Sequence, residues 1–119
     1  QNGRLITTVG VVNRQDADDI STVADHLSRR DDITLVVVWG VVDGRVRLSV
    51  RSRDMTLSLK DFLADRFGAD SVGAKLSPDG RGIGGGLLTL DLGWLESEQT
   101  QDAILKVVAL RLSELIFRE

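Results

Sequence analysis

Residues 33–53 read ITLVVVWGVVDGRVRLSVRSR, and this stretch decides the fold. The pair Asp43-Gly44 readily takes the two positive φ angles of a type I′ turn, so the flanking segments are predicted to form an antiparallel hairpin. The run from Ile33 to Val42 is apolar almost throughout, as in a central strand covered on both faces. The run from Arg45 to Arg53 alternates instead, which predicts one apolar and one basic face.

The segments before the hairpin predict a strand followed by a helix. Leu5 to Val12 is rich in β-branched residues and ends before an asparagine, which is typical of a strand. Asp16 to Arg29 carries apolar residues at helical spacing, namely Ile20, Val23, Ala24 and Leu27.

The segments after the hairpin predict two helices and one more strand. Ser58 to Phe67 has one apolar stripe, and Ser58 offers an N-cap. Gly68 to Gly86 is expected to form a long glycine-rich loop, after which Leu87 to Leu92 resumes as a strand. Ser97 to Phe117 is predicted to be a long, well-covered helix, with a broad apolar stripe widened by Leu105, Leu110 and Phe117.

These elements predict an α/β fold: a mixed β-sheet with the Asp-Gly hairpin at its centre, flanking helices and a long C-terminal helix. At 119 residues and 42% hydrophobic content, residues 1–119 are expected to form a single domain. The chain starts without Met at Gln1 and enters a strand at once, so we expect an excised fragment of a longer protein.

Composition excludes several kinds of site and partner. With a net charge of -3, no overall positive field would hold nucleic acid by counterion release, so any polyanion site must be local. The chain has no Cys and one His, which excludes disulfides, zinc clusters and arrangements that need two histidines. No apolar run is long enough to span a membrane, and we expect a cytoplasmic protein without a membrane partner.

Two stretches together suggest an anion site. The hairpin ends in Ser49-Val50-Arg51-Ser52-Arg53, and residues 80–86 read GRGIGGG with Arg81 inside. Guanidinium groups grip phosphate oxygens with two parallel hydrogen bonds, and glycines let backbone N–H groups approach the same oxygens. Each stretch alone is more typical of a solvated strand face or a flexible loop. The glycine stretch is neither a Walker P-loop nor a dinucleotide fingerprint, because no Gly-Lys-Ser/Thr ends it and a strand follows it.

The acidic cluster and the histidine favour structural interpretations. Asp16, Asp18 and Asp19 stand at the start of a predicted helix, where carboxylates cap free N–H groups and oppose the helix dipole. His26 falls off the apolar stripe, which indicates a surface position rather than a metal ligand.

The order of these parts resembles the carboxy-terminal, DHH-associated domain of DHH-family phosphoesterases. In that family a hairpin strand ending in Ser-x-Arg-Ser is followed by a helix and a glycine-rich motif, usually Gly-Gly-Gly-His. Residues 42–53 look like the hairpin, residues 59–67 like the helix, Phe67-Gly68 like the opening of the motif, and Gly84-Gly85-Gly86 like its end. The likeness covers about Leu5 to Leu92. The family's histidine is absent, and Ser77 or Lys75 is a candidate for its place.

The resemblance implies a substrate-binding domain for short oligonucleotides, nucleoside bisphosphates or cyclic dinucleotides. It implies no cofactor in this fragment, with manganese held by a catalytic Asp-His-His domain elsewhere in the parent chain. Hydrolysis by this chain alone is not expected. Independently of the resemblance, the apolar sides of the C-terminal helix predict either a homodimer through this helix or a contact with the absent catalytic domain. The implied binding residues are Ser49, Arg51, Ser52, Arg53, Lys75, Arg81, Gly84, Gly85 and Gly86. A non-enzymatic ligand-sensing or protein-interaction module remains the alternative.

Overall fold

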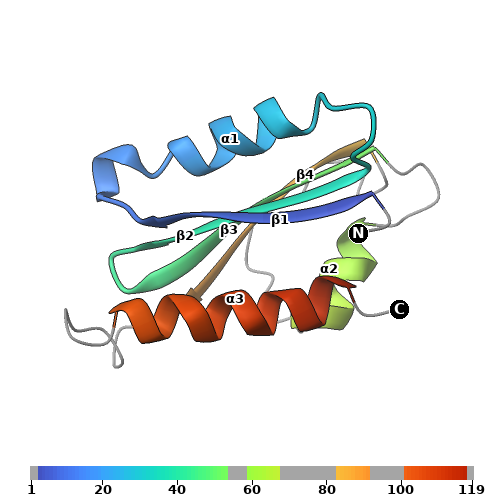
Figure 1. Cartoon of the computed structure of the whole chain (residues 1–119). Coiled ribbons are helices and arrows are strands. Elements are labelled where there is room, and N and C mark those ends of the chain that lie inside the picture. The colour runs from blue at the N-terminus through green and yellow to red at the C-terminus, as the bar shows by residue number, and fades with distance from the viewer. Residues whose placement is uncertain (1–2, 54–58, 68–82, 92–100, 118–119) are drawn as a thin grey trace.

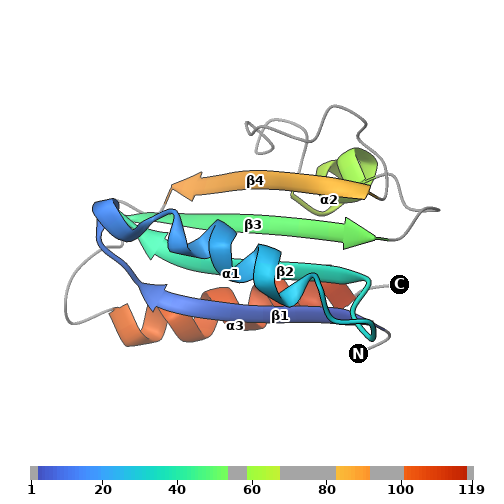
Figure 2. The same ribbon diagram turned by 90° about the horizontal axis from the view of Figure 1, so that it is seen from above.

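The hairpin at Asp43-Gly44 lies inside a four-stranded mixed sheet (Figures 1 and 2). The computed structural model describes residues 3–53, 59–67, 83–91 and 101–117, with the backbone alone at 60, 83–91 and 101. The strands are β1 (Arg4–Val11), β2 (Leu35–Val42), β3 (Arg45–Arg53) and β4 (Ile83–Asp91). The helices are α1 (Asp19–Leu27), α2 (Leu59–Phe67) and α3 (Gln101–Phe117), and a 3₁₀ turn, η1 (Arg14–Asp16), precedes α1.

The sheet has the order β1-β2-β3-β4. β1 pairs with β2 in parallel, so the chain must cross over between them, and it does so through α1. β2 with β3 and β3 with β4 pair in antiparallel fashion. At the β2–β3 turn, Asp43 has φ 52° and Gly44 has φ 71°, the two positive angles that a type I′ turn requires.

Helices cover both faces of the sheet, with α1 on one face and α2 and α3 on the other (Figure 1). Because side chains alternate along a strand, β2 sends apolar groups to both layers, and all eight of its residues are buried. Towards α1 the core contains Ala17, Ile20, Ala24, Ile33, Val36, Val38 and Val42. Towards α2 and α3 it contains Leu35, Val37, Trp39, Val41, Val46, Leu48, Val50, Leu59, Phe62, Leu63, Leu112 and Ile116.

The predicted fold class is confirmed, and two boundaries are corrected. β4 begins at Ile83, so the glycine run from 84 to 86 belongs to a strand and not to the predicted loop. Glycine weakens a strand because it has no side chain to pack, and here the pairing with β3 holds the glycine run in strand conformation. The predicted helix from Asp16 is split, because η1 ends at Asp16 and α1 begins at Asp19. Ser58, the predicted N-cap of α2, lies outside the described residues.

α3 is covered on one side only, so the prediction of a well-covered helix is wrong for its outer face. Leu112, Leu115 and Ile116 are buried, whereas Val107 is 66% exposed and Leu110 is 65% exposed. None of the described helices is long and apolar enough to cross a membrane.

Arginines from other elements bind the free carbonyl end of α3. Arg4 Nη1 of β1 donates to the Ile116 carbonyl oxygen at 2.8 Å, and Arg66 Nε of α2 donates to the Leu115 carbonyl oxygen at 3.1 Å. Cations are favourable at this end because the helix dipole is negative there. Both guanidinium groups also lie over the Phe62 ring, so β1, α2 and α3 are tied at one point.

Candidate phosphate-binding site

The basic face of β3 looks towards α1. Side chains of a strand alternate between faces, so Arg45, Arg47, Ser49, Arg51 and Arg53 share one face. Contacts fix which face this is, because Ser49 meets Ser21 of α1 and Arg51 meets Asp25 of α1. The predicted basic face is therefore partly covered by a helix rather than fully solvated.

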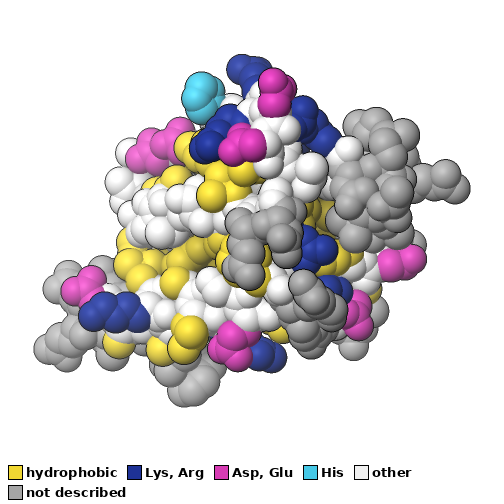
Figure 3. Space-filling model, turned by 45° about the vertical axis from the view of Figure 1, so that its right-hand side comes forward, with side chains coloured by type: hydrophobic (Ala, Val, Ile, Leu, Met, Phe, Trp, Pro, Cys, Tyr) yellow, Lys and Arg dark blue, Asp and Glu magenta, His cyan; other side chains and the backbone are white. Residues whose placement is uncertain are grey.

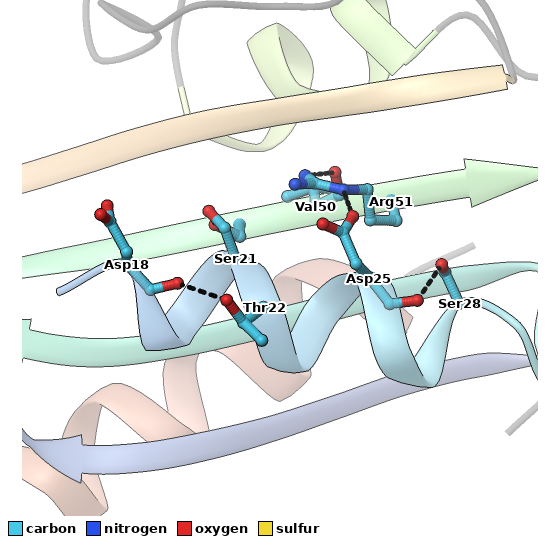
Figure 4. Close-up of polar contacts among 8 residues, drawn as sticks. Asp18, Ser21, Thr22, Asp25, Ser28, Val50 and Arg51 are labelled. Carbon is cyan, nitrogen blue, oxygen red and sulfur yellow. Dashed lines mark hydrogen bonds and ion pairs between the residues drawn. The ribbon is translucent and has the colours of Figure 1, made fainter. Parts of the chain in front are cut away.

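Arg51 is held in a fixed orientation by two hydrogen bonds (Figure 4). Its Nε donates to Asp25 Oδ1 at 2.6 Å, and its Nη1 donates to the Val50 carbonyl oxygen at 2.9 Å. The Arg51 side chain is 24% exposed. A guanidinium has five N–H groups, so three of those of Arg51 have no partner within the described part of the chain. Arg51 is thus oriented by α1 and still able to donate to an oxyanion.

The register of β3 and β4 brings the two predicted motifs together. Ser52 pairs with Gly84, Arg51 with Gly85, and Val50 with Gly86. Gly85 carries no side chain, so β4 places none beside Arg51 at that position. An arginine and a glycine run more than thirty residues apart in sequence are therefore neighbours in the sheet.

The glycines approach Arg51 in strand geometry and not as a loop. Consecutive residues of a strand point their N–H groups in opposite directions, whereas an oxyanion nest needs successive N–H groups that converge. Gly84, Gly85 and Gly86 all lie within β4. The backbone can therefore contribute single N–H groups along the strand, but not the converging set expected from a loop.

Three other predicted binding residues are engaged within the fold. Arg53 donates from Nε and Nη2 to the Ile33 carbonyl oxygen at 3.2 Å and 2.6 Å, and from Nη2 to the Arg30 carbonyl oxygen at 2.5 Å. Ser49 is 1% exposed, and its Oγ shares a 2.7 Å hydrogen bond with Ser21 Oγ. Ser52 is 3% exposed and lies on the face opposite to Arg51. One ligand cannot touch the side chains of both Arg51 and Ser52 from the same face.

The remaining predictions divide between the described and the undescribed segments. Lys75 and Arg81 lie outside the described residues. Asp18 occupies the N-cap of α1 as expected, but it makes no side-chain capping hydrogen bond. His26 is exposed on α1, at a surface where side chains of both charges gather (Figure 3). Among the described residues no group of acidic or histidine side chains is arranged to hold a metal ion.

Asp25 is the residue that the sequence analysis missed. It belongs to a polar row along α1 and its two caps, made of Asp18, Ser21, Asp25 and Ser28, which lies on the side of β3 in Figure 4. The signal was available, because these positions recur every three or four residues, on the flank of the apolar stripe of the same helix. A polar row beside a basic strand face predicts ion pairs between the two.

Comparison with known proteins leaves the family open. No family model matches the chain, and no curated protein sequence matches it. Among solved structures, the C-Ala domain of alanyl-tRNA synthetase from Aquifex aeolicus is similar with a TM-score of 0.49 and 9% sequence identity, over 87% of this chain and 88% of that chain. A likeness of this size assigns neither a family nor a function. The resemblance to DHH-associated domains stays a prediction based on the motifs.

Proposed function

We propose that this chain binds nucleotides or short single-stranded nucleic acid at Arg51, beside the glycine run of β4, and does not hydrolyse them alone. The observation that carries the proposal is the pairing of Arg51 with Gly85. Asp25 holds one edge of the guanidinium, and the free N–H groups are of the kind that grip a phosphate. Because the Arg51 side chain is already ordered, less conformational entropy is lost when a ligand binds.

The finer proposal is a substrate-binding domain of a cytoplasmic, metal-dependent phosphoesterase of the DHH family. Its support is the motif resemblance together with the strand–helix–strand order that places Arg51 and Gly85 side by side. In that case a catalytic domain of the parent chain would hold manganese. A ligand-sensing or protein-interaction module with the same fold is the alternative, and an Asp-His-His segment in the parent reading frame would decide for the hydrolase.

Arg51→Ala is expected to weaken binding of adenosine monophosphate about tenfold, since a charge-assisted hydrogen bond contributes about 1.5 to 3 kcal/mol and about 1.4 kcal/mol is tenfold in affinity. The measurement is a titration monitored by the amide resonances of Gly84, Gly85 and Gly86.

Arg45→Ala is the matched control for this variant. Arg45 shares the strand face but lies six residues away, which is about 20 Å along a strand. Equal losses in the two variants would reduce the site to a diffuse basic face and overturn the proposal. The same samples, incubated with manganese and a short RNA, should release no phosphate above a control without protein.

We further propose that the outer face of α3 joins two copies of the chain. Leu110 is 65% exposed, and Lys106 and Glu114 are exposed four residues to either side of it. Two antiparallel copies of α3 that meet at Leu110 would therefore place unlike charges opposite each other, which favours this pairing.

Leu110→Glu is expected to abolish self-association by placing two carboxylates at the centre of the contact. Sedimentation across a concentration series measures the effect. The control is Thr22→Glu, which adds the same charge at an exposed position of α1. A strictly monomeric wild-type protein at every concentration would show that this proposal is wrong.

A further inference from the structure

A pocket of about 310 Å³ lies at the hairpin end of the sheet, away from Arg51. It is lined by Arg14, Val42, Asp43, Arg45 and Arg47. Arg47 is four residues from Arg51 on β3, which is about 13 Å along the strand. The pocket is therefore a separate place in the fold, and none of its described lining residues belongs to the site proposed above.

The pocket concentrates positive charge in an acidic protein. Among the described residues that line it, three arginines stand against one aspartate, which gives these residues a formal charge of +2, whereas the whole chain carries -3. Arg45 and Arg47 stand two residues apart on one strand face, about 6.6 Å apart at Cα, so their side chains can converge on one ligand. Within the described part of the chain neither has a hydrogen bond or ion pair.

Arg14 is the third cation and is only loosely engaged. Its Nε donates to Asp43 Oδ2 at 2.6 Å, and the two side chains are 84% and 50% exposed. Exposed ion pairs contribute little to stability, so Arg14 can exchange Asp43 for a ligand oxyanion at small cost. The turn fixes Asp43, because its positive φ of 52° belongs to the type I′ geometry.

We infer that this pocket binds a small ligand through a diphosphate group. Two unpaired guanidiniums and a third that can be released match an oxyanion with several negative charges, because each guanidinium donates two parallel hydrogen bonds to a phosphate. Among the described residues that line the pocket Val42 is the one apolar side chain, so these residues offer no aromatic ring for a base to stack on. Recognition therefore rests on the charged group, and the volume suits a small molecule.

The test is a titration of the whole chain with inorganic diphosphate, followed by the amide resonances of Asp43 and Gly44 at the pocket and of Gly84 to Gly86 at the other site. Inorganic phosphate and citrate are run in parallel, and a short single-stranded RNA tests the macromolecular alternative. We expect diphosphate to shift Asp43 and Gly44, and to bind more tightly than phosphate or citrate. Tighter binding of citrate or of RNA at the pocket would overturn the assignment to diphosphate.

Two variants with opposite expected effects make the test sharp. Arg47→Ala should weaken diphosphate binding at least tenfold, because it removes the guanidinium of a half-buried arginine that has no other partner in the described structure. Asp43→Asn should strengthen it several-fold, because it removes a negative charge from the lining while Asn tolerates the positive φ of the turn. A simple loss of folding cannot produce the second result.

Arg29→Ala is the control, since Arg29 is an exposed arginine just beyond the end of α1 and should not affect binding. Equal losses in Arg47→Ala and Arg29→Ala, or an unchanged affinity in Asp43→Asn, would overturn the pocket. If diphosphate instead shifts Gly84 to Gly86 and Arg51→Ala abolishes its binding, the pocket inference fails and the proposed function stands. If Arg47→Ala removes diphosphate binding while Arg51→Ala leaves the binding of adenosine monophosphate unchanged, the pocket inference stands and the proposed function fails.

Discussion

Trp39→Ala is expected to destabilise the protein by about 3 to 5 kcal/mol, the range for truncating a large buried aromatic side chain. Trp39 is 1% exposed and belongs to the core between the sheet and the helices α2 and α3. It lies on β2, one of the two inner strands of the sheet, so the cavity would open between β2 and the helices α2 and α3. Domains of this size are stable by about 5 to 15 kcal/mol, so much of the native stability would be lost.

Urea denaturation followed by far-ultraviolet circular dichroism measures this effect without relying on tryptophan fluorescence. Val11→Ala is the control, because it also shortens an apolar side chain but at a position on β1 that is 45% exposed. Its free energy of unfolding should change by less than about 0.5 kcal/mol. A loss below about 1 kcal/mol for Trp39→Ala would mean that the side chain does not support this core.

The hairpin could be predicted from sequence because its information is local. Two residues with positive φ define the turn, and the alternation of β3 then fixes which of its residues face each helix layer. β2 was recognised as central for the same reason, since a strand without polar residues must be covered on both faces.

The missed features depend on partners that are distant in sequence. The glycines of β4 carry no pattern of their own and become a strand because β3 pairs with them. Composition alone could not show that Val107 and Leu110 of α3 stay exposed, because only the position of the sheet decides which side of an apolar helix is covered.

The candidate site shows the same division between local and distant information. The sequence analysis proposed Arg51 and the glycine run as binding residues, and the register of β3 and β4 makes them neighbours in the sheet. It could not show that Arg53 is engaged elsewhere, because both residues are arginines on one strand face. The difference lies in the loop after α1, whose carbonyl oxygens at Arg30 and Ile33 accept hydrogen bonds from Arg53.

Gly40→Ala is expected to destabilise the protein by about 1 to 3 kcal/mol, as overpacking of a well-filled core does. Gly40 lies on β2 beneath α1, where an added Cβ would lie 2.8 Å from Val9 Cγ2 and 3.0 Å from the Gly10 carbonyl oxygen. It would also lie 3.3 Å from Ile20 Cδ1 of α1. Replacing glycine in a strand gains about 0.5 to 1 kcal/mol of backbone entropy, which is smaller than the expected steric penalty.

A double-mutant cycle with Val9→Ala tests the steric origin of that loss, because this second change removes the methyl group that makes the closest contact. Gly40→Ala should cost less in the Val9→Ala background, with a coupling of about 0.5 kcal/mol or more. The remaining penalty comes from a backbone oxygen and from α1, the helix whose Asp25 orients Arg51. Gly40→Ala should therefore also weaken adenosine monophosphate binding in the folded protein, and an identical cost in both backgrounds would show that Val9 and the new methyl group do not meet.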